Sequence, residues 1–174
     1  MNLSVRKIVI SGILGAISIL LGVTRLGFIP VPTPAGHATI MHIPAILGGV
    51  LEGPVVGLIT GAIFGLFSFL QPGAPFFADP LVSVVPRLFI GVVAYLIYYS
   101  TKKLNNVLAC VLAGAFGSAT NTVLVLGMAT WRGYLPAEVS ISVGVLHGVP
   151  ELIIAAVLTV ILVKGIQRIR PTEE

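Results

Sequence analysis

Long apolar runs alternate with short polar or proline-rich segments along the whole chain of 174 residues. A helix needs roughly 20 apolar residues to cross the hydrocarbon core of a bilayer. The second run is short, because as a helix it rises only about 21 Å, so it either borrows residues from the preceding loop or does not cross fully. The pattern predicts six transmembrane helices, at residues 5–23, 38–51, 55–70, 79–100, 107–128 and 139–163.

Proline and glycine separate these runs. After the first run, Pro30, Pro32 and Pro34 favour an extended segment, because alternating prolines fix the backbone dihedral and remove donors. The Glu52-Gly53-Pro54 sequence breaks what would otherwise be an apolar run too long for one span. No soluble linker is visible, so we expect a single six-helix membrane domain over residues 1–174.

Composition excludes most other classes of protein. Hydrophobic residues make up 56% of the chain and charged residues 9%, against about 25% charged residues in an ordinary soluble domain. The mean hydropathy is +1.08. A soluble globular domain of this size could not hide so much apolar surface. We therefore expect an all-α integral membrane protein of the cell membrane, with several spans, in contact with the lipid bilayer.

The basic residues indicate an orientation. The net charge is +4, from 10 basic and 6 acidic residues. Cytoplasmic loops of membrane proteins carry an excess of Lys and Arg, and here one side of the predicted topology holds most of them. Both termini are therefore predicted to be cytoplasmic, and we expect no nucleic-acid partner. That side carries Arg6, Lys7, Lys102, Lys103, Lys164, Arg168 and Arg170, and the other carries Arg25 and Arg132.

A few costly polar side chains lie within the predicted spans. An ionisable group at the centre of a bilayer costs about 2.5–3.5 kcal/mol on insertion scales, and such residues often mark a substrate path. By their positions, all of them fall in the outer half of the membrane, which predicts a polar cavity open to the outside. They are Arg87, Asn121, His147, Glu151, His42 and Asp79.

Structural interpretations of the same residues remain open. Arg87 and Glu151 could form an ion pair with each other, and His147 could pack against Glu151 one helical turn away. His42 and Asn121 could hydrogen-bond neighbouring helices. Asp79 precedes a proline, which is typical of a helix N-cap.

Several functions lack the residues they would need. The sequence has no P-loop, no His or Cys cluster suited to a metal, and one aspartate, which excludes an intramembrane aspartyl dyad. Cys110 is the single cysteine. We therefore expect neither an enzyme nor a cofactor, and no catalytic or metal-binding residues.

Two motifs resemble those of a known family. The Ile43-Pro44-Ala45-Ile46-Leu47-Gly48-Gly49 run is followed by Gly53-Pro54-Val55-Val56-Gly57, and both lie among six short spans with a proline-rich first outer loop. Asp79-Pro80 through Pro86-Arg87 and Thr120-Asn121-Thr122 fit the same pattern. Together they resemble the substrate-binding S component of energy-coupling factor (ECF) vitamin transporters.

The resemblance implies a division of labour. An S component captures a water-soluble vitamin from outside and delivers it inward with a membrane T component and two ECF ATPases. Docking in the family uses small residues of the first span, which here correspond to Gly12 and Ala16, with glycine in place of the first alanine.

The resemblance also suggests roles for the polar residues. Arg87 would anchor an anion or carbonyl, and Asn121, His147 and Glu151 would hydrogen-bond the vitamin. His42 would lie at the mouth, and Phe77 and Trp131 would stack on the ligand or close over it.

The vitamin and the transport mode remain open from sequence. Pantothenate is favoured because an arginine binds a carboxylate bidentately, and pyridoxine, hydroxymethylpyrimidine or riboflavin are alternatives, especially if Glu151 neutralises Arg87. A stand-alone proton-coupled carrier of small solutes, in which His147 and Glu151 titrate, is the alternative function.

Overall fold

A computed structural model describes residues 4–30 and 37–169. These residues form helices throughout, apart from one short antiparallel hairpin. The elements are α1 (Val5–Val23), β1 (Phe28–Pro30), β2 (His37–Thr39), α2 (Ile43–Glu52), α3 (Pro54–Leu70), the 3₁₀ helix η1 (Pro75–Ala78), α4 (Pro80–Ser83), α5 (Val85–Thr101), α6 (Asn106–Trp131) and α7 (Ala137–Ile169).

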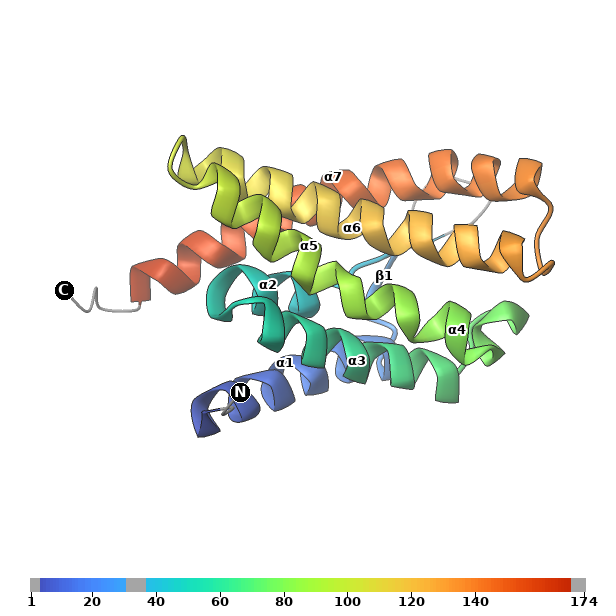
Figure 1. Cartoon of the computed structure of the whole chain (residues 1–174), viewed down its shortest axis with the longest axis horizontal. Helices are drawn as coiled ribbons and strands as arrows, with labels where there is room; N and C mark the ends of the chain where they lie inside the picture. Colours follow the sequence, from blue (N-terminus) through green and yellow to red (C-terminus); the bar gives the residue numbers. More distant parts are fainter. Residues whose placement is uncertain (1–3, 31–36, 170–174) are drawn as a thin grey trace.

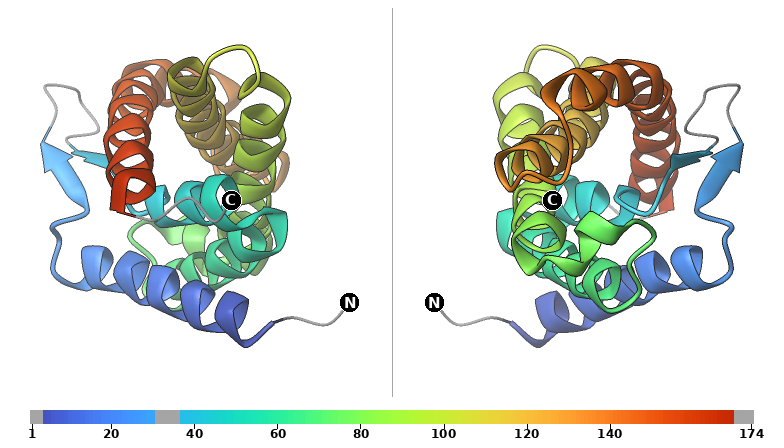
Figure 2. Two further views of the ribbon diagram at one scale, coloured as in Figure 1. Left: turned by 90° about the vertical axis from the view of Figure 1, so that its left-hand side faces the viewer. Right: turned by 90° about the vertical axis from the view of Figure 1, so that its right-hand side faces the viewer.

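The long helices form an elongated bundle (Figure 1). α6 packs between α5 and α7, and α5 also packs against α3. Figure 2 shows α1 inclined across the outside of the bundle, and the hairpin lies on the side of α7. The start of α1 and the end of α7 lie at the same end of the bundle (Figure 1).

Four helical segments are long and apolar enough to cross a membrane. They are α1, α6, α7 and the pair α4–α5, which together cover residues Pro80–Thr101. Each of the six predicted apolar runs contains a helix, but α2 and α3 have only 10 and 17 residues. The prediction of six complete spans is therefore confirmed only in part.

The short helix α2 lies inside the protein. Its residues Ile43 through Val50 are all buried, and it contacts α1, α3, α5, α6 and α7. A helix of this length rises about 15 Å, half the thickness of the hydrocarbon core. Neighbouring helices therefore surround α2, and β2 of the hairpin before it packs against α7.

The break between the second and third helices lies at the residues where the sequence predicted it. α2 ends at Glu52 and α3 begins at Pro54. Between them Gly53 has φ of 98°, a conformation that glycine adopts without the steric cost of a Cβ atom. In the predicted extended segment, β1 pairs with β2 so that Phe28 lies opposite Thr39. Pro32 and Pro34 lie outside the described residues.

Glycines bring three helix backbones into contact near the centre of the bundle. A Cβ atom on Gly49 would collide with the carbonyl oxygen of Gly91, and one on Gly61 with the carbonyl oxygen of Arg87. Small residues permit this approach between membrane helices, where van der Waals packing replaces the hydrophobic effect as the driving force. The close contact of α3 with α5 fixes the depth and rotation of Arg87.

Candidate functional site

A cavity of about 470 Å³ lies between α3, η1, α5, α6 and α7, and residues of α1 and the hairpin complete its wall. Its volume is in the range of about 300–1,000 Å³ that is typical of small-molecule sites. Five of the predicted site residues line it together, and they come from four separate elements. They are Phe77, Arg87, Asn121, His147 and Glu151.

Arg87 is the central cation of this cavity. It lies in the first turn of α5 and is 3% exposed. Its Nη1 donates to the carbonyl oxygen of Val82 at 2.7 Å. The guanidinium carbon lies 4.7 Å from the ring centroid of Phe77 and 5.4 Å from that of Phe64. These aromatic faces attract the cation but do not neutralise its charge.

Arg87 has no acidic partner within 4.0 Å among the described residues. Its Nε also lacks a hydrogen-bond partner there, although the atom is buried. A buried charge without a counter-charge is costly unless something else pairs with it. The ion pair between Arg87 and Glu151 that the sequence left open is therefore absent from this part of the chain.

Glu151 is instead held by three other polar groups of the protein. Its Oε1 accepts a hydrogen bond from the backbone N–H of Thr39 at 2.7 Å and lies 3.1 Å from Nε2 of His147. The Thr122 hydroxyl lies 3.5 Å from its Oε2. The carboxylate thus joins β2, α6 and α7 at the wall of the cavity.

Polar atoms without partners surround the same space. Within residues 4–30 and 37–169, Asn121 Oδ1 and His147 Nδ1 are buried and make no hydrogen bond. Leaving a buried donor or acceptor unsatisfied costs about 1–3 kcal/mol. A polar ligand in the cavity could supply the missing partners.

The amino-acid sequence of the chain can be compared with those of known proteins. A family model described as "ECF transporter, substrate-specific component" matches residues 6–165, which is nearly the whole chain. The chain belongs to this family. It is also 30% identical over 159 residues to the pantothenic acid transporter PanT of Lactococcus lactis subsp. cremoris (strain MG1363), covering 76% of this chain and 79% of that relative.

Membership of this family establishes the location and the general role of the protein. This S component is a multi-pass protein of the cell membrane that takes part in transport, as the apolar helices and the transporter relatives agree. The family and the relative are transporters and not enzymes. Among the residues that the structure describes, no group of three or more His, Cys, Asp or Glu side chains could hold a metal ion.

His42 of the S component is placed differently from the predicted position at the mouth. It is fully buried at the start of α2 and is not among the residues that line the cavity. Neither ring nitrogen finds a hydrogen-bond partner in the described part of the chain. The reason is the short α2, which starts deep in the bundle instead of near the surface.

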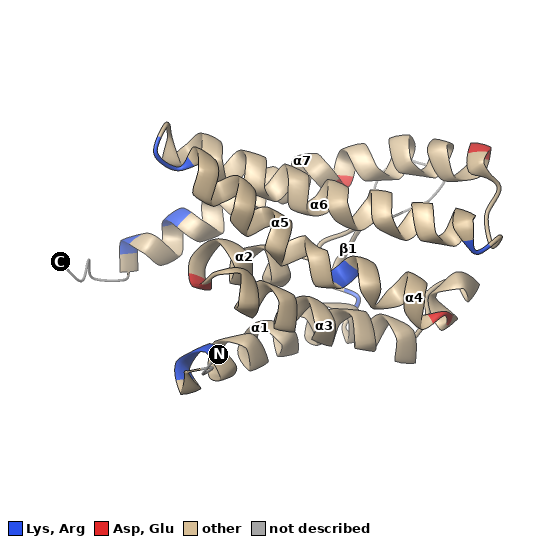
Figure 3. Cartoon of the chain, viewed as in Figure 1, with Lys and Arg blue, Asp and Glu red and all other residues tan. Residues whose placement is uncertain are grey.

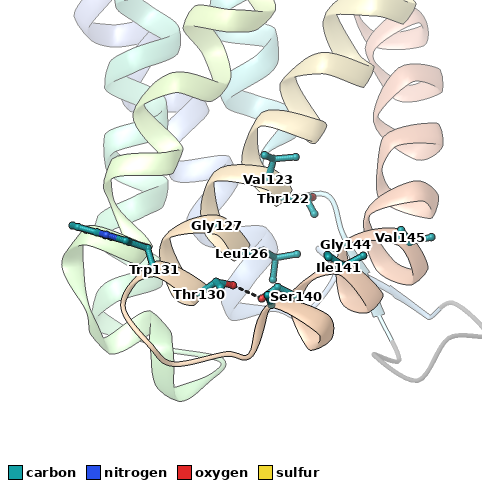
Figure 4. Close-up of a pocket in the computed structure, with 11 residues that line it drawn as sticks. Thr122, Val123, Leu126, Gly127, Thr130, Trp131, Ser140, Ile141, Gly144 and Val145 are labelled. Carbon is teal, nitrogen blue, oxygen red and sulfur yellow. Dashed lines mark hydrogen bonds between the residues drawn. The ribbon is translucent and has the colours of Figure 1, made fainter.

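Trp131 lines a separate hollow. It is 77% exposed at the end of α6, and the hollow of about 570 Å³ beside it lies between α6 and α7. Figure 4 shows Trp131 pointing away from Leu126 and Ile141, while the Thr130 and Ser140 hydroxyls meet at 2.6 Å across the two helices. Trp131 therefore does not contact the cavity in this structure.

A charged clamp fixes the loop that carries Phe77. The Asp79 carboxylate caps α4 by accepting from the backbone N–H of Leu81 at 2.9 Å, which confirms the N-cap interpretation. It also accepts from Arg132 Nε at 2.7 Å and from the Tyr134 hydroxyl at 3.2 Å. We call Asp79, Arg132 and Tyr134 the outer clamp.

The outer clamp changes the ionisation of its members. The Leu81 backbone N–H, followed by the Arg132 guanidinium, holds the pKa of the Asp79 carboxyl below its usual value. The hydrogen bond and charge of Asp79 in turn raise the pKa of Arg132. Asp79 and Arg132 are therefore both charged near neutral pH, and the clamp ties the segment after α6 to the start of α4.

Two small residues of α1, Gly12 and Ala16, face away from the bundle. Gly12 and Ala16 are exposed, whereas Ser11, Gly15 and Ser18 are buried. A Cβ atom on Gly12 would have no neighbour within 4 Å. The outer face of α1 is therefore open for contact along these positions.

Sequence reasoning missed several lining residues. Thr39 acts through its backbone N–H, which no residue pattern reveals. Phe64 and Phe67 of α3 lie within an ordinary apolar run. Thr122 was part of the quoted Thr-Asn-Thr motif, which was the one available signal for its position.

Proposed function

We propose that this S component binds pantothenate in the cavity between α3, η1, α5, α6 and α7. The main support for this proposal is the buried Arg87. It has no acidic partner within 4.0 Å in the described residues, and it lines a cavity of vitamin size. A carboxylate would pair with its guanidinium by charge-assisted hydrogen bonds. The PanT relative supports a pantothenate-like substrate.

The remaining polar groups suit the rest of that molecule. Pantothenate carries an amide and two hydroxyl groups beyond its carboxylate, and Asn121, His147 and Glu151 offer acceptors and donors for them. Phe77 lies over the guanidinium and would form the wall of the site on the η1 side of the vitamin. We assign His42 and Trp131 no contact with the vitamin, because neither lines the cavity.

Ligand pairs can separate pantothenate from the other vitamins. Pyridoxine, hydroxymethylpyrimidine and riboflavin have no carboxylate, and panthenol matches pantothenate except that an alcohol replaces the carboxylate. A ligand that binds the native state raises the apparent stability by mass action. We expect pantothenate to raise the Tm of the purified protein and panthenol to have little effect. Equal stabilisation by panthenol or pyridoxine would contradict the carboxylate site.

We also propose the topology that this function needs. The hairpin and α2 together would provide one passage, with the hairpin in the outer half and α2 in the inner half, so that six passages leave both termini in the cytoplasm. Irregular backbone is tolerated at membrane depth where protein surrounds it. Lys and Arg gather at the end where α1 begins and α7 ends (Figure 3), which supports a cytoplasmic assignment of that end.

Inward delivery would depend on partner proteins. We propose that a membrane T component docks on the exposed face of α1 at Gly12 and Ala16, and that two ECF ATPases supply the energy. The family description, a substrate-specific component, supports this division. It does not favour a stand-alone proton-coupled carrier.

The docking proposal predicts a separation of binding from transport. Gly12→Leu and Ala16→Leu should leave the affinity for pantothenate unchanged but abolish uptake in cells that contain the partner proteins, because the added side chains prevent close helix contact. Binding is measured by calorimetry and uptake with labelled vitamin. Gly127→Leu is a matched control, because a Cβ atom there also meets nothing within 4 Å. Normal uptake by the α1 variants would remove this face from the docking surface.

A further inference from the structure

A second hollow lies at the end of the bundle opposite the vitamin cavity. It has a volume of about 430 Å³ and is formed where α6 begins and α7 ends. Its lining residues are Asn106, Lys164, Gly165, Gln167 and Arg168. None of these residues takes part in vitamin binding or in the proposed docking face on α1.

The hollow carries two cations and no described anion. Lys164 and Arg168 are one turn apart on α7, so their side chains share a helix face and repel each other. No carboxylate lies within 4.0 Å of either side chain among residues 4–30 and 37–169. A bound anion would relieve the repulsion.

Hydrogen bonds connect two lining residues of the hollow, Asn106 and Gln167, to each other and to Tyr98. The Tyr98 hydroxyl donates to Asn106 Oδ1 at 2.8 Å, Asn106 Nδ2 donates to Gln167 Oε1 at 3.1 Å, and Gln167 Nε2 donates to the Tyr98 hydroxyl at 3.2 Å. This ring of three side chains joins the ends of α5, α6 and α7. The first turn of α6 also directs the positive end of its helix dipole toward this region.

The preference for Lys and Arg in cytoplasmic loops would explain basic residues at a cytoplasmic helix end. It would not explain the open space beside them. Gly165 lies between the two cations in sequence, and a Cβ atom there would meet nothing within 4 Å. Exposed apolar side chains continue along the same face of α7, with Ile161 at 58% and Val157 at 53% exposure. The cations thus lie next to an apolar strip that points toward the membrane centre.

We propose that this hollow binds the phosphodiester headgroup of an anionic phospholipid, with an acyl chain along Val157 and Ile161. Lys164 and Arg168 would contact the phosphate, and the Asn106 and Gln167 amides would contact the glycerol part of the headgroup. Anionic lipids of the inner leaflet attract basic residues near the membrane surface by about 1 kcal/mol each. The apolar strip favours a lipid over a free phosphate ion.

The test measures lipid binding to the purified, delipidated full chain by native mass spectrometry. Dioleoyl phosphatidylglycerol is compared with dioleoyl phosphatidylcholine, which has the same chains and a zwitterionic headgroup. We expect the wild type to prefer phosphatidylglycerol. The double variant Lys164→Gln and Arg168→Gln should bind it roughly tenfold to thirtyfold more weakly, from the loss of two charges near the surface.

Three further variants separate the role of the hollow from the effects of net charge and of folding. Lys102→Gln with Lys103→Gln removes the same charge at the same end of the bundle but outside the hollow, and should keep phosphatidylglycerol affinity within about twofold, because distant charges contribute only screened attraction. Gly165→Leu fills the hollow while both cations remain, and should weaken binding, whereas Gly127→Leu should not. If the double glutamine variant fails to fold, the difference in phosphatidylglycerol binding between Gly165→Leu and Gly127→Leu tests whether the lipid binds in the hollow.

Three results would overturn the proposal. They are equal binding of the two lipids by the wild type, an equal loss in the Lys102 and Lys103 control, and unchanged binding in Gly165→Leu. Thermal stabilisation by inorganic phosphate alone, equal to that by phosphatidylglycerol, would replace the lipid with a free anion. Pantothenate binding at the other end is independent of each outcome.

Discussion

The cavity and the outer clamp both contain an arginine and a carboxylate, but they use the charges in opposite ways. In the clamp, Arg132 and Asp79 neutralise each other at 2.7 Å. In the cavity, Arg87 and Glu151 are kept apart, and Glu151 is occupied by Thr39 and His147. The difference teaches that an ion pair completes a structure, whereas a buried charge without a carboxylate in direct contact leaves a place for a ligand.

Packing explains how the protein keeps Arg87 unpaired. The close glycine contacts between α3 and α5 fix the start of α5, and two aromatic rings and the Val82 carbonyl hold the guanidinium. The clamp has no such framework and relies on its own charges, at the end of the bundle opposite the start of α1. Three experiments can break or sharpen this comparison.

The largest effect is expected from removing the two arginines separately. Arg87→Ala should weaken pantothenate binding roughly thirtyfold to several-thousandfold, the range for truncating one partner of a buried charged hydrogen bond. Arg132→Ala removes the same side chain from the clamp and should leave the affinity within about threefold, since its charge is already satisfied by Asp79. Calorimetry on both purified variants measures this difference. Similar affinity losses would show that the two arginines do not differ in the way proposed.

A smaller effect is expected at Glu151. Glu151→Ala leaves the Thr39 N–H and the His147 ring without an acceptor, which should weaken binding roughly tenfold to a hundredfold. Glu151→Gln keeps an oxygen that can accept from Thr39 and should restore affinity to within about fivefold of wild type. Binding titrations of the two variants provide the comparison.

The same pair of variants tests whether transport of the vitamin is coupled to proton movement through Glu151. A carrier that moves protons through Glu151 would lose uptake in Glu151→Gln, because glutamine does not titrate. We expect uptake by this variant to follow its binding affinity. Complete loss of uptake with intact binding would contradict the partner-driven mechanism.

The smallest effect is expected at the clamp and depends on pH. The pKa of Asp79 is lowered in the folded state, so the clamp stabilises the protein above the ordinary carboxyl pKa of about 4. This contribution is lost as the pH falls through the lower folded value. Asp79→Asn should therefore lower the Tm slightly at neutral pH, and the difference from wild type should shrink under acid conditions.

Thermal unfolding of both proteins between neutral and acidic pH checks this expectation. Glu138→Gln is a suitable control, because this acid lies in the first turn of α7 at the same end of the bundle and forms no ion pair among the described residues. A Tm difference for Asp79→Asn that grows toward low pH would contradict the direction assigned to the pKa.

The sequence predicted much of the fold because burial in lipid imposes a simple rule. Apolar runs located the helices, and Gly53 located the turn between α2 and α3. The scarcity of polar residues within those runs identified Arg87, Asn121, His147 and Glu151, which the structure brings to one cavity. Each of these predictions follows from the cost of placing a polar group in the membrane.

The sequence by itself determined that this is a helical membrane protein, where its helices break, and which few side chains are too costly to face lipid. Only the tertiary structure decided that Arg87 and Glu151 do not pair, that α2 lies buried inside the bundle, and that Trp131 points away from the cavity. The physical reason is that both the lipid-facing and the buried faces of a membrane helix are apolar. Local pattern therefore cannot fix the rotation of a helix, which depends on close contacts such as Gly61 against Arg87.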